Sequence, residues 1–171
     1  MRIATFVHEG QRHVGQVAAD GQSVTAFALD AAQAARGALP LIEAAASGAA
    51  LPALTGPAIP LASVHVEAPL PVPRRNLWCV GRNYHEHAKE LQASVFKDNN
   101  ANPATWPIVF TKVPECVIAH GDDVVLPGAA VSEQIDYEAE LAVIIGVGGK
   151  NITREDAISH VYGYTIVNDV T

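Results

Sequence analysis

Short segments in which apolar and polar residues alternate follow one another along the chain, and this period of two is typical of strands. In the first part of the chain the pattern predicts a three-stranded meander at residues 2–7, 14–17 and 24–27. A turn at 8–11 separates the first two strands. The pair Asp20-Gly21, a strong hairpin signal, separates the second strand from the third.

Four helices are predicted, and the one that Asn83 begins is described below with the second domain. Asp30 and Gln33 have the spacing of a capping box, which begins a short alanine-rich helix. A second short helix is predicted at 41–46, where Ser47-Gly48 follows as a stop signal. A third helix is predicted at 153–160, because Thr153 and the aspartate three residues later can cap it.

A boundary between two domains is predicted near residue 70. Prolines stand at positions 69, 71 and 73, and this spacing favours extended backbone and interrupts helices and ladders. We therefore expect a small N-terminal β-rich module at 1–70 and a second domain at 71–171. The fold class predicted for the whole chain is α+β, with mostly β structure.

The second domain begins with a strand pattern at 76–80, typical of a buried strand, and a second strand is predicted at 107–112. Between them, a turn leads into a helix that Asn83 caps. The polar loop at 93–107 is long for a compact domain and suits a lid or a specificity loop. Residues 121–128 predict a turn and another short strand.

The run at 135–146 alternates apolar and acidic residues and then becomes almost wholly apolar, which predicts a strand that enters a core. Because side chains alternate across a strand, Glu138 and Glu140 lie on the same face. A further strand at 161–169 ends with Asp169. If the two strands pair antiparallel, the three carboxylates meet at one edge of the sheet, and we predict this arrangement.

Three carboxylates at one edge suit a hard cation such as Mg²⁺, Mn²⁺ or Ca²⁺ better than zinc or copper. The alternative is a solvated outer face of an edge strand.

On the predicted helix that follows Asn83, His87 and Glu90 are three residues apart, so the carboxylate can orient the imidazole as a general base. Such pairs are also common decoration of helix surfaces. Lys112 can hold a substrate carboxylate, or it is a solvated strand end.

Composition narrows the function classes. The 171 residues are 49% hydrophobic, which indicates a globular protein. No apolar run approaches the length of a membrane span and no signal peptide is recognised, so we expect a cytoplasmic protein without membrane contact. The net charge of −7 and the lack of a basic cluster argue against nucleic-acid binding. Cys79 and Cys116 predict neither a disulfide framework nor a zinc site.

From about residue 73 onward, the chain resembles the fumarylacetoacetate hydrolase family, and the first 70 residues are more weakly similar to the small β-rich domain of many two-domain members. The motifs that carry the resemblance are Gly81-Arg82-Asn83-Tyr84 with His87 and Glu90, Phe110-Thr111-Lys112, Asp136 to Leu141, and Gly163-Tyr164-Thr165 with Asn168-Asp169. Their order and spacing together make the resemblance specific.

The resemblance implies a mixed β-sandwich roll for the second domain and a homodimer. It implies Mg²⁺ or Mn²⁺ held by Glu138, Glu140 and Asp169, with His87 and Glu90 as the dyad that activates water. Substrate contacts are implied for three residues, Arg82, Tyr84 and Lys112.

The reaction implied is hydrolysis of a C–C bond in a small anionic 1,3-dicarbonyl or 2-oxo acid, such as an acylpyruvate or a fumarylacetoacetate-like compound. Decarboxylation or isomerisation of an oxo acid at the same site is an alternative, since stabilised enolate charge serves all three reactions. A non-catalytic relative of the fold is another. An iron oxygenase would need histidines beside the carboxylates, and neither His120 nor His160 shares a strand face with Glu138.

Two departures from the family pattern affect these expectations. After Lys112 the chain continues Val113-Pro114-Glu115, where the family often has proline and small hydroxyl residues, so substrate contacts in that loop are not carried over. The family's further strands and a glycine-lysine segment have no counterpart before Thr171. We therefore expect the sequence to be truncated at its C-terminal side and the roll to be incomplete.

Overall fold

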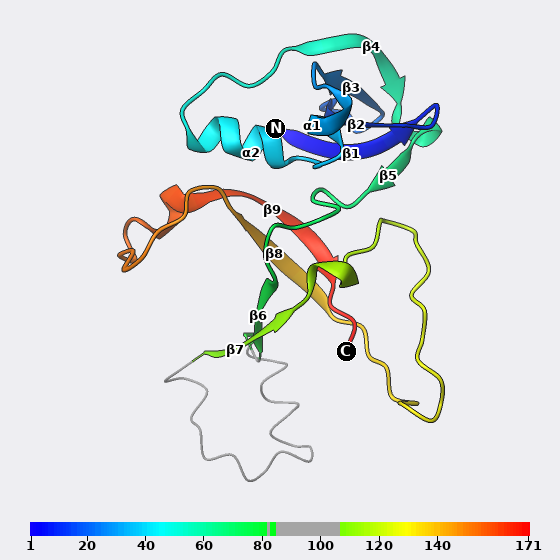
Figure 1. Ribbon diagram of the computed structural model, residues 1–171, viewed down its shortest axis with the longest axis vertical. Coiled ribbons are helices and arrows are strands. Elements are labelled where there is room, and N and C mark those ends of the chain that lie inside the picture. The colour runs from blue at the N-terminus through cyan, green and yellow to red at the C-terminus, as the bar shows by residue number, and fades with distance from the viewer. Residues whose placement is uncertain (82, 85–106) are drawn as a thin grey trace. The chain divides into compact units, whose positions relative to one another are not determined.

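The computed structural model describes residues 1–81, 83–84 and 107–171 (Figure 1). These residues belong to two compact units, one made of Met1–Pro71 with Ile118–Thr171 and the other of Val72–Val117. The first unit takes in segments from both sides of the predicted boundary near residue 70. The division of the chain into domains at 1–70 and 71–171 stays a prediction.

A five-stranded antiparallel sheet forms most of the N-terminal module, with the strand order β4-β3-β2-β1-β5. Its strands are β1 (Arg2–His8), β2 (Gln11–Val17), β3 (Ser23–Phe27), β4 (Leu54–Pro60) and β5 (His65–Glu67). The predicted meander is confirmed as β1 to β3. The turn between β1 and β2 uses Glu9 and Gly10, both at positive φ, which suits a two-residue hairpin loop.

The sequence pattern did not reveal β4 and β5. Strand β4 contains Pro57 and ends at Pro60, and proline cannot donate a ladder hydrogen bond. Such a strand is confined to the edge of a sheet, which is where β4 lies. Strand β5, three residues long, is too short to show a periodicity.

Both short helices of the module lie where the sequence predicts them. Helix α1 (Ala31–Ala34) begins with the capping box: the Gln33 backbone N–H donates to Asp30 Oδ1 over 2.8 Å, and the Asp30 N–H donates to Gln33 Oε1 over 3.0 Å. Helix α2 (Leu39–Ala46) ends before Gly48, which adopts the left-handed conformation with φ of 71°. A 3₁₀ turn, η1 (Leu61–Ser63), joins β4 to β5.

The core of the described chain lies within residues 4–42. One cluster contains Phe6 and Val24, and a second contains Val14 and Leu41, all of them almost completely shielded from solvent. Burial of apolar side chains is the main favourable contribution to folding. The N-terminal module therefore holds the best-packed part of the described structure.

The second unit contains an antiparallel pair, β6 (Leu77–Gly81) and β7 (Ile108–Lys112), followed by the 3₁₀ turn η2 (Pro114–Cys116). Both strands confirm the sequence prediction. The expectation that the first of them is buried is wrong, because Trp78 is 74% exposed. In the described residues these two strands form a sheet by themselves, so no further strand shields their outer faces.

A second antiparallel pair, in the first unit, consists of β8 (Ala139–Ile145) and β9 (Val161–Asn168), with η3 (Ala157–His160) preceding β9. Strand β8 begins later than the predicted start at residue 135. The short strand predicted within 121–128 is wrong, since no strand is formed there.

The helix predicted at 153–160 is also wrong, since only the 3₁₀ turn η3 forms. The Thr153 hydroxyl donates to Asp156 Oδ2 over 2.8 Å and accepts the Asp156 backbone N–H over 3.2 Å. These two bonds close a local turn that competes with a continuous helix. A single 3₁₀ turn then leads into β9.

Candidate metal centre

The antiparallel pairing of β8 and β9 places the predicted carboxylates. In the register, Ala139 is opposite Asn168 and Glu140 is opposite Val167. The predicted antiparallel arrangement is thereby confirmed. A parallel arrangement would have placed Glu138 and Asp169 at opposite ends of the pair.

Backbone hydrogen bonds extend this register past the ends of both strands. The Asp169 N–H donates to the Glu138 carbonyl over 2.8 Å. Two residues further out, Asp136 and Thr171 exchange both of their backbone hydrogen bonds, at 2.8 and 3.1 Å. Glu138 is therefore directly across from Asp169, and Glu140 follows two residues later on the same face.

Asn168 holds the Glu138 backbone in this arrangement. Its side-chain oxygen, Oδ1, accepts the Glu138 N–H over 3.2 Å, so the end of one strand is tied to the other by an amide side chain. Sequence reasoning used Asn168 only as part of a family motif and gave it no role. The available signal was an asparagine next to Asp169 at a strand end, a type of residue that often bonds nearby backbone.

The acidic face of β8 is the more shielded of its two faces. Glu138 and Glu140 are partly buried, whereas Leu141 and Val143 on the other face are 56% and 47% exposed. Across from them on β9, Tyr164 and Ile166 are 58% and 79% exposed. The expectation that the apolar face of this strand enters a core is wrong for the described chain. A two-stranded pair contributes no second layer that would cover this face.

The three carboxylates supply only oxygen donors, and their chemistry fits a hard divalent cation. The backbone register brings them to one face and one edge. Within the described ranges, however, no three histidine, cysteine, aspartate or glutamate side chains gather closely enough to hold a metal ion together. Donor chemistry and backbone placement agree with the predicted site at Glu138, Glu140 and Asp169, whereas the positions of the side chains do not. Metal binding there stays a prediction.

The residues predicted to act in catalysis and substrate binding do not belong to the β8–β9 pair. His87, Glu90 and Arg82 lie outside the described residues. Tyr84 is exposed, and Lys112 is the partly buried last residue of β7, where it pairs with Leu77 in the second unit. Their predicted roles in catalysis and substrate binding stay predictions.

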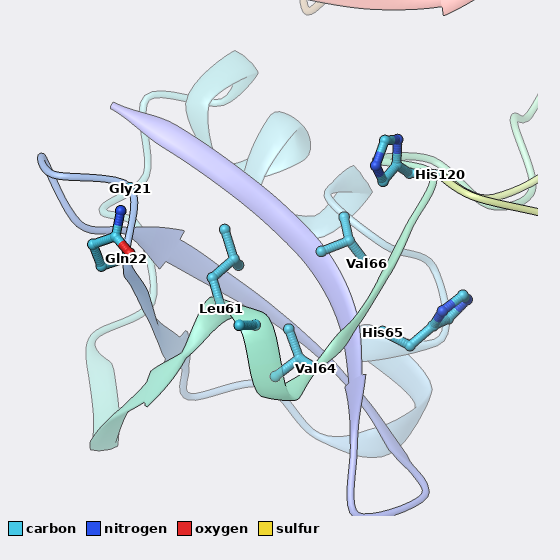
Figure 2. A pocket seen from close by; sticks show the side chains of 8 residues that line it. Gly21, Gln22, Leu61, Val64, His65, Val66 and His120 are labelled. Carbon is cyan, nitrogen blue, oxygen red and sulfur yellow. The ribbon is translucent and has the colours of Figure 1, made fainter.

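A groove in the first unit is lined by other residues (Figure 2). Its walls include the apolar side chains of Leu61, Val64 and Val66, and two histidines, His65 and His120, stand beside them. The His65 imidazole lies 3.8 Å from an Asp122 carboxylate oxygen. None of the described residues predicted to bind metal or substrate lines this groove. It is therefore separate from the candidate metal centre.

These elements define a mostly β protein of the α+β class, with a small antiparallel module and paired strands that carry an acidic edge. Residues 76–171, more than half of the chain, match the profile of the family described as fumarylacetoacetate (FAA) hydrolase C-terminal. The chain belongs to the fumarylacetoacetate hydrolase family.

Comparison with individual relatives supports this assignment. The chain is 47% identical over 111 residues to an oxaloacetate tautomerase of Bacillus subtilis, YisK, and the match covers 65% of this chain and 35% of the relative. The matched part of the chain thus spans about a third of the length of this relative.

Solved structures agree with the fold. A fumarylacetoacetate hydrolase from Exiguobacterium antarcticum has a TM-score of 0.73 at 31% identity, covering 100% of this chain and 56% of that one. A maleylpyruvate hydrolase from Sphingobium, solved with manganese(II) and pyruvate, has a TM-score of 0.70 at 28% identity, covering 100% and 59%. The predicted fold class is confirmed by these neighbours.

Among the described residues, no helix is both long enough and apolar enough to cross a membrane.

Proposed function

We propose that this chain carries the metal-binding part of an enzyme that acts on a small anionic 2-oxo acid. The observation that supports the proposal most strongly is the β8–β9 register, which brings Glu138, Glu140 and Asp169 to one face. A cation bound between three carboxylates at one edge would offset their mutual repulsion.

In this proposal Glu138, Glu140 and Asp169 hold Mg²⁺ or Mn²⁺. When bound, the cation supplies electrostatic stabilisation of the negative charge that develops on the neighbouring oxygens of a 2-oxo acid. Asn168 keeps the Glu138 backbone against β9 through the 3.2 Å hydrogen bond to its N–H. His87, oriented by Glu90, moves a proton at the substrate carbon or at water.

We propose tautomerisation of an oxaloacetate-like acid as the first candidate reaction. The relative that is 47% identical over 111 residues is named an oxaloacetate tautomerase. Interconversion of keto and enol forms moves one proton from carbon and returns one to oxygen. A single base such as His87 can serve both transfers, and no water is consumed.

Hydrolysis of a C–C bond is the second candidate. A structural neighbour at 28% identity is named a maleylpyruvate hydrolase and was solved with manganese(II) and pyruvate. In this reaction His87 would take a proton from water, which then attacks the carbonyl next to the bond that breaks. Decarboxylation uses the same charge stabilisation and stays a third option. Arg82, Tyr84 and Lys112 would hold the substrate's anionic groups.

The proposal also covers the localisation, the oligomeric state and the partners of this enzyme. We propose a cytoplasmic homodimer whose partner is a small anionic substrate. The net charge of −7 favours neither nucleic acid nor an anionic membrane surface as a partner.

An assay on a panel of oxo acids tests the proposed function. The protein is given oxaloacetate and several acylpyruvates, with Mg²⁺, with Mn²⁺ or with EDTA. We expect metal-dependent loss of the enol absorbance of oxaloacetate, faster than the uncatalysed reaction. Release of pyruvate from an acylpyruvate would assign hydrolysis instead, and release of CO₂ would assign decarboxylation. No turnover with either metal would contradict the proposal and favour a non-catalytic relative of the fold.

A further inference from the structure

We propose that the segment Glu67–Pro71, called here the strap, is latched onto the N-terminal module. The chain then leaves the module at a fixed point. The sequence predicts only an extended, proline-rich boundary at this place. The structure shows contacts from three separate parts of the module to these five residues. The inference is independent of the proposed function.

The Pro69 carbonyl is the centre of the latch. It accepts a hydrogen bond from the Thr5 hydroxyl over 3.0 Å and another from the Ala38 backbone N–H over 2.8 Å. Thr5 is fully buried in β1, and a buried hydroxyl without a partner destabilises a fold. Detachment of the strap would remove this partner. The hydroxyl of Thr5 therefore favours the attached state.

A charged pair holds the beginning of the strap. The Arg12 guanidinium of β2 donates from Nη2 to Glu67 Oε1 over 2.8 Å and from Nε to Glu67 Oε2. Two parallel bonds of this kind match the geometry of guanidinium and carboxylate, and they are stronger than a single surface contact. The Glu67 side chain is only 15% exposed. The hydrogen bond to Glu67 also raises the pKa of Arg12 above its ordinary value.

Gly37 provides the space into which the strap fits. A Cβ atom at this position would lie 2.5 Å from the Pro69 carbonyl oxygen and 2.5 Å from Pro71 Cδ. Contacts this short are not tolerated, so the strap approaches the module only because residue 37 has no side chain. The φ of 61° at Gly37 favours glycine as well.

The strap itself is suited to a fixed position. Pro69 and Pro71 restrict their own φ angles, so less conformational entropy is lost when the segment is held. Neither proline has an N–H that would need a partner. The strap therefore contacts the module through its carbonyl and side-chain groups. After Glu67 it needs no strand-to-strand backbone hydrogen bonds to stay in place.

Hydrogen exchange at the Ala38 amide tests the latch directly, because this N–H donates to the strap. The test compares Gly37→Ala with Gly48→Ala in the whole chain. Gly48 has a φ of 71°, so alanine is strained there too, but nothing lies within 4 Å of its missing Cβ. We expect Ala38 to exchange at least about tenfold faster in Gly37→Ala than in Gly48→Ala. The amides of β2 should stay protected in both variants.

A second pair of variants keeps the test decisive if Gly37→Ala does not fold. Thr5→Val removes the hydroxyl that reaches Pro69 and keeps the shape, whereas Thr5→Ser keeps the hydroxyl. We expect Thr5→Val to lower the backbone order parameters of Ala68 and Leu70 from values near 0.85 toward 0.6, and Thr5→Ser to leave them higher. Equal Ala38 exchange in the two glycine variants, or wild-type order parameters below about 0.6, would overturn the proposal.

Discussion

We expect Glu138→Gln and Glu140→Gln each to lower metal-dependent turnover by at least about 100-fold. This is the first of the two largest effects that we expect. Glutamine keeps the size and shape of the side chain and removes the negative charge that attracts the cation. Loss of groups that merely orient metal ligands already costs about 10- to 100-fold, so the loss of a ligand charge should cost at least as much. Steady-state kinetics at saturating Mg²⁺, and again at saturating Mn²⁺, measure the effect.

Glu155→Gln is the matched control for this prediction. Glu155 is exposed and lies in the turn that precedes η3, away from the β8–β9 edge, and we expect its replacement to leave turnover within about twofold of the wild type. If both ligand variants kept wild-type turnover at every metal concentration, the carboxylates would have no part in catalysis. The solvated-face interpretation of this strand would then be favoured.

His87→Ala lowers kcat by about 10²- to 10⁴-fold while leaving Mn²⁺ affinity unchanged, which is the second large effect. The loss follows from removal of the proposed base, whereas the metal ligands stay in place. The measurement pairs kcat under saturating substrate with a Mn²⁺ titration of the same preparation.

His120→Ala provides the comparison, because His120 stands at the separate groove rather than at the proposed active site. We expect it to keep wild-type kcat. A His87→Ala variant as active as His120→Ala would exclude His87 as the base. A His87→Ala variant that also lost Mn²⁺ would assign this residue to the metal centre instead.

Local patterns in the sequence predicted the strands that carry the candidate site. Alternation placed Glu138 and Glu140 on one face, and this follows from the geometry of any strand. The capping box of Asp30 and Gln33 was equally local, because both of its hydrogen bonds join residues three apart. These two features were therefore predictable from the sequence.

Features that depend on packing against distant residues were predicted less well. Trp78 and Leu141 have the apolar character of buried strands, yet burial requires a second layer that the pattern of one strand does not specify. The turn at Thr153 shows that a local feature can be mispredicted as well. Its side-chain hydrogen bonds favoured a local turn over the helix that the capping pattern predicts.

The latch around Pro69 could not be predicted from the sequence for a different reason. Its donors, Thr5 and Ala38, are 64 and 31 residues away along the chain. In the sequence, Gly37 resembles a simple helix stop. Only the structure shows that the strap occupies the space that a side chain at residue 37 would fill. Proline spacing predicted extended backbone, whereas the chain bends at residues 69–72. The spacing also contains no information about what the segment contacts.

A Mn²⁺ titration followed by electron paramagnetic resonance tests the central claim most directly, because it requires no knowledge of the substrate. The protein is compared with the Glu138→Gln/Glu140→Gln double variant and with Glu155→Gln. The account predicts a bound Mn²⁺ ion in the wild type and in Glu155→Gln, and at least about 100-fold weaker binding in the double variant. Equal Mn²⁺ affinity in all three proteins would contradict a metal centre at the β8–β9 edge.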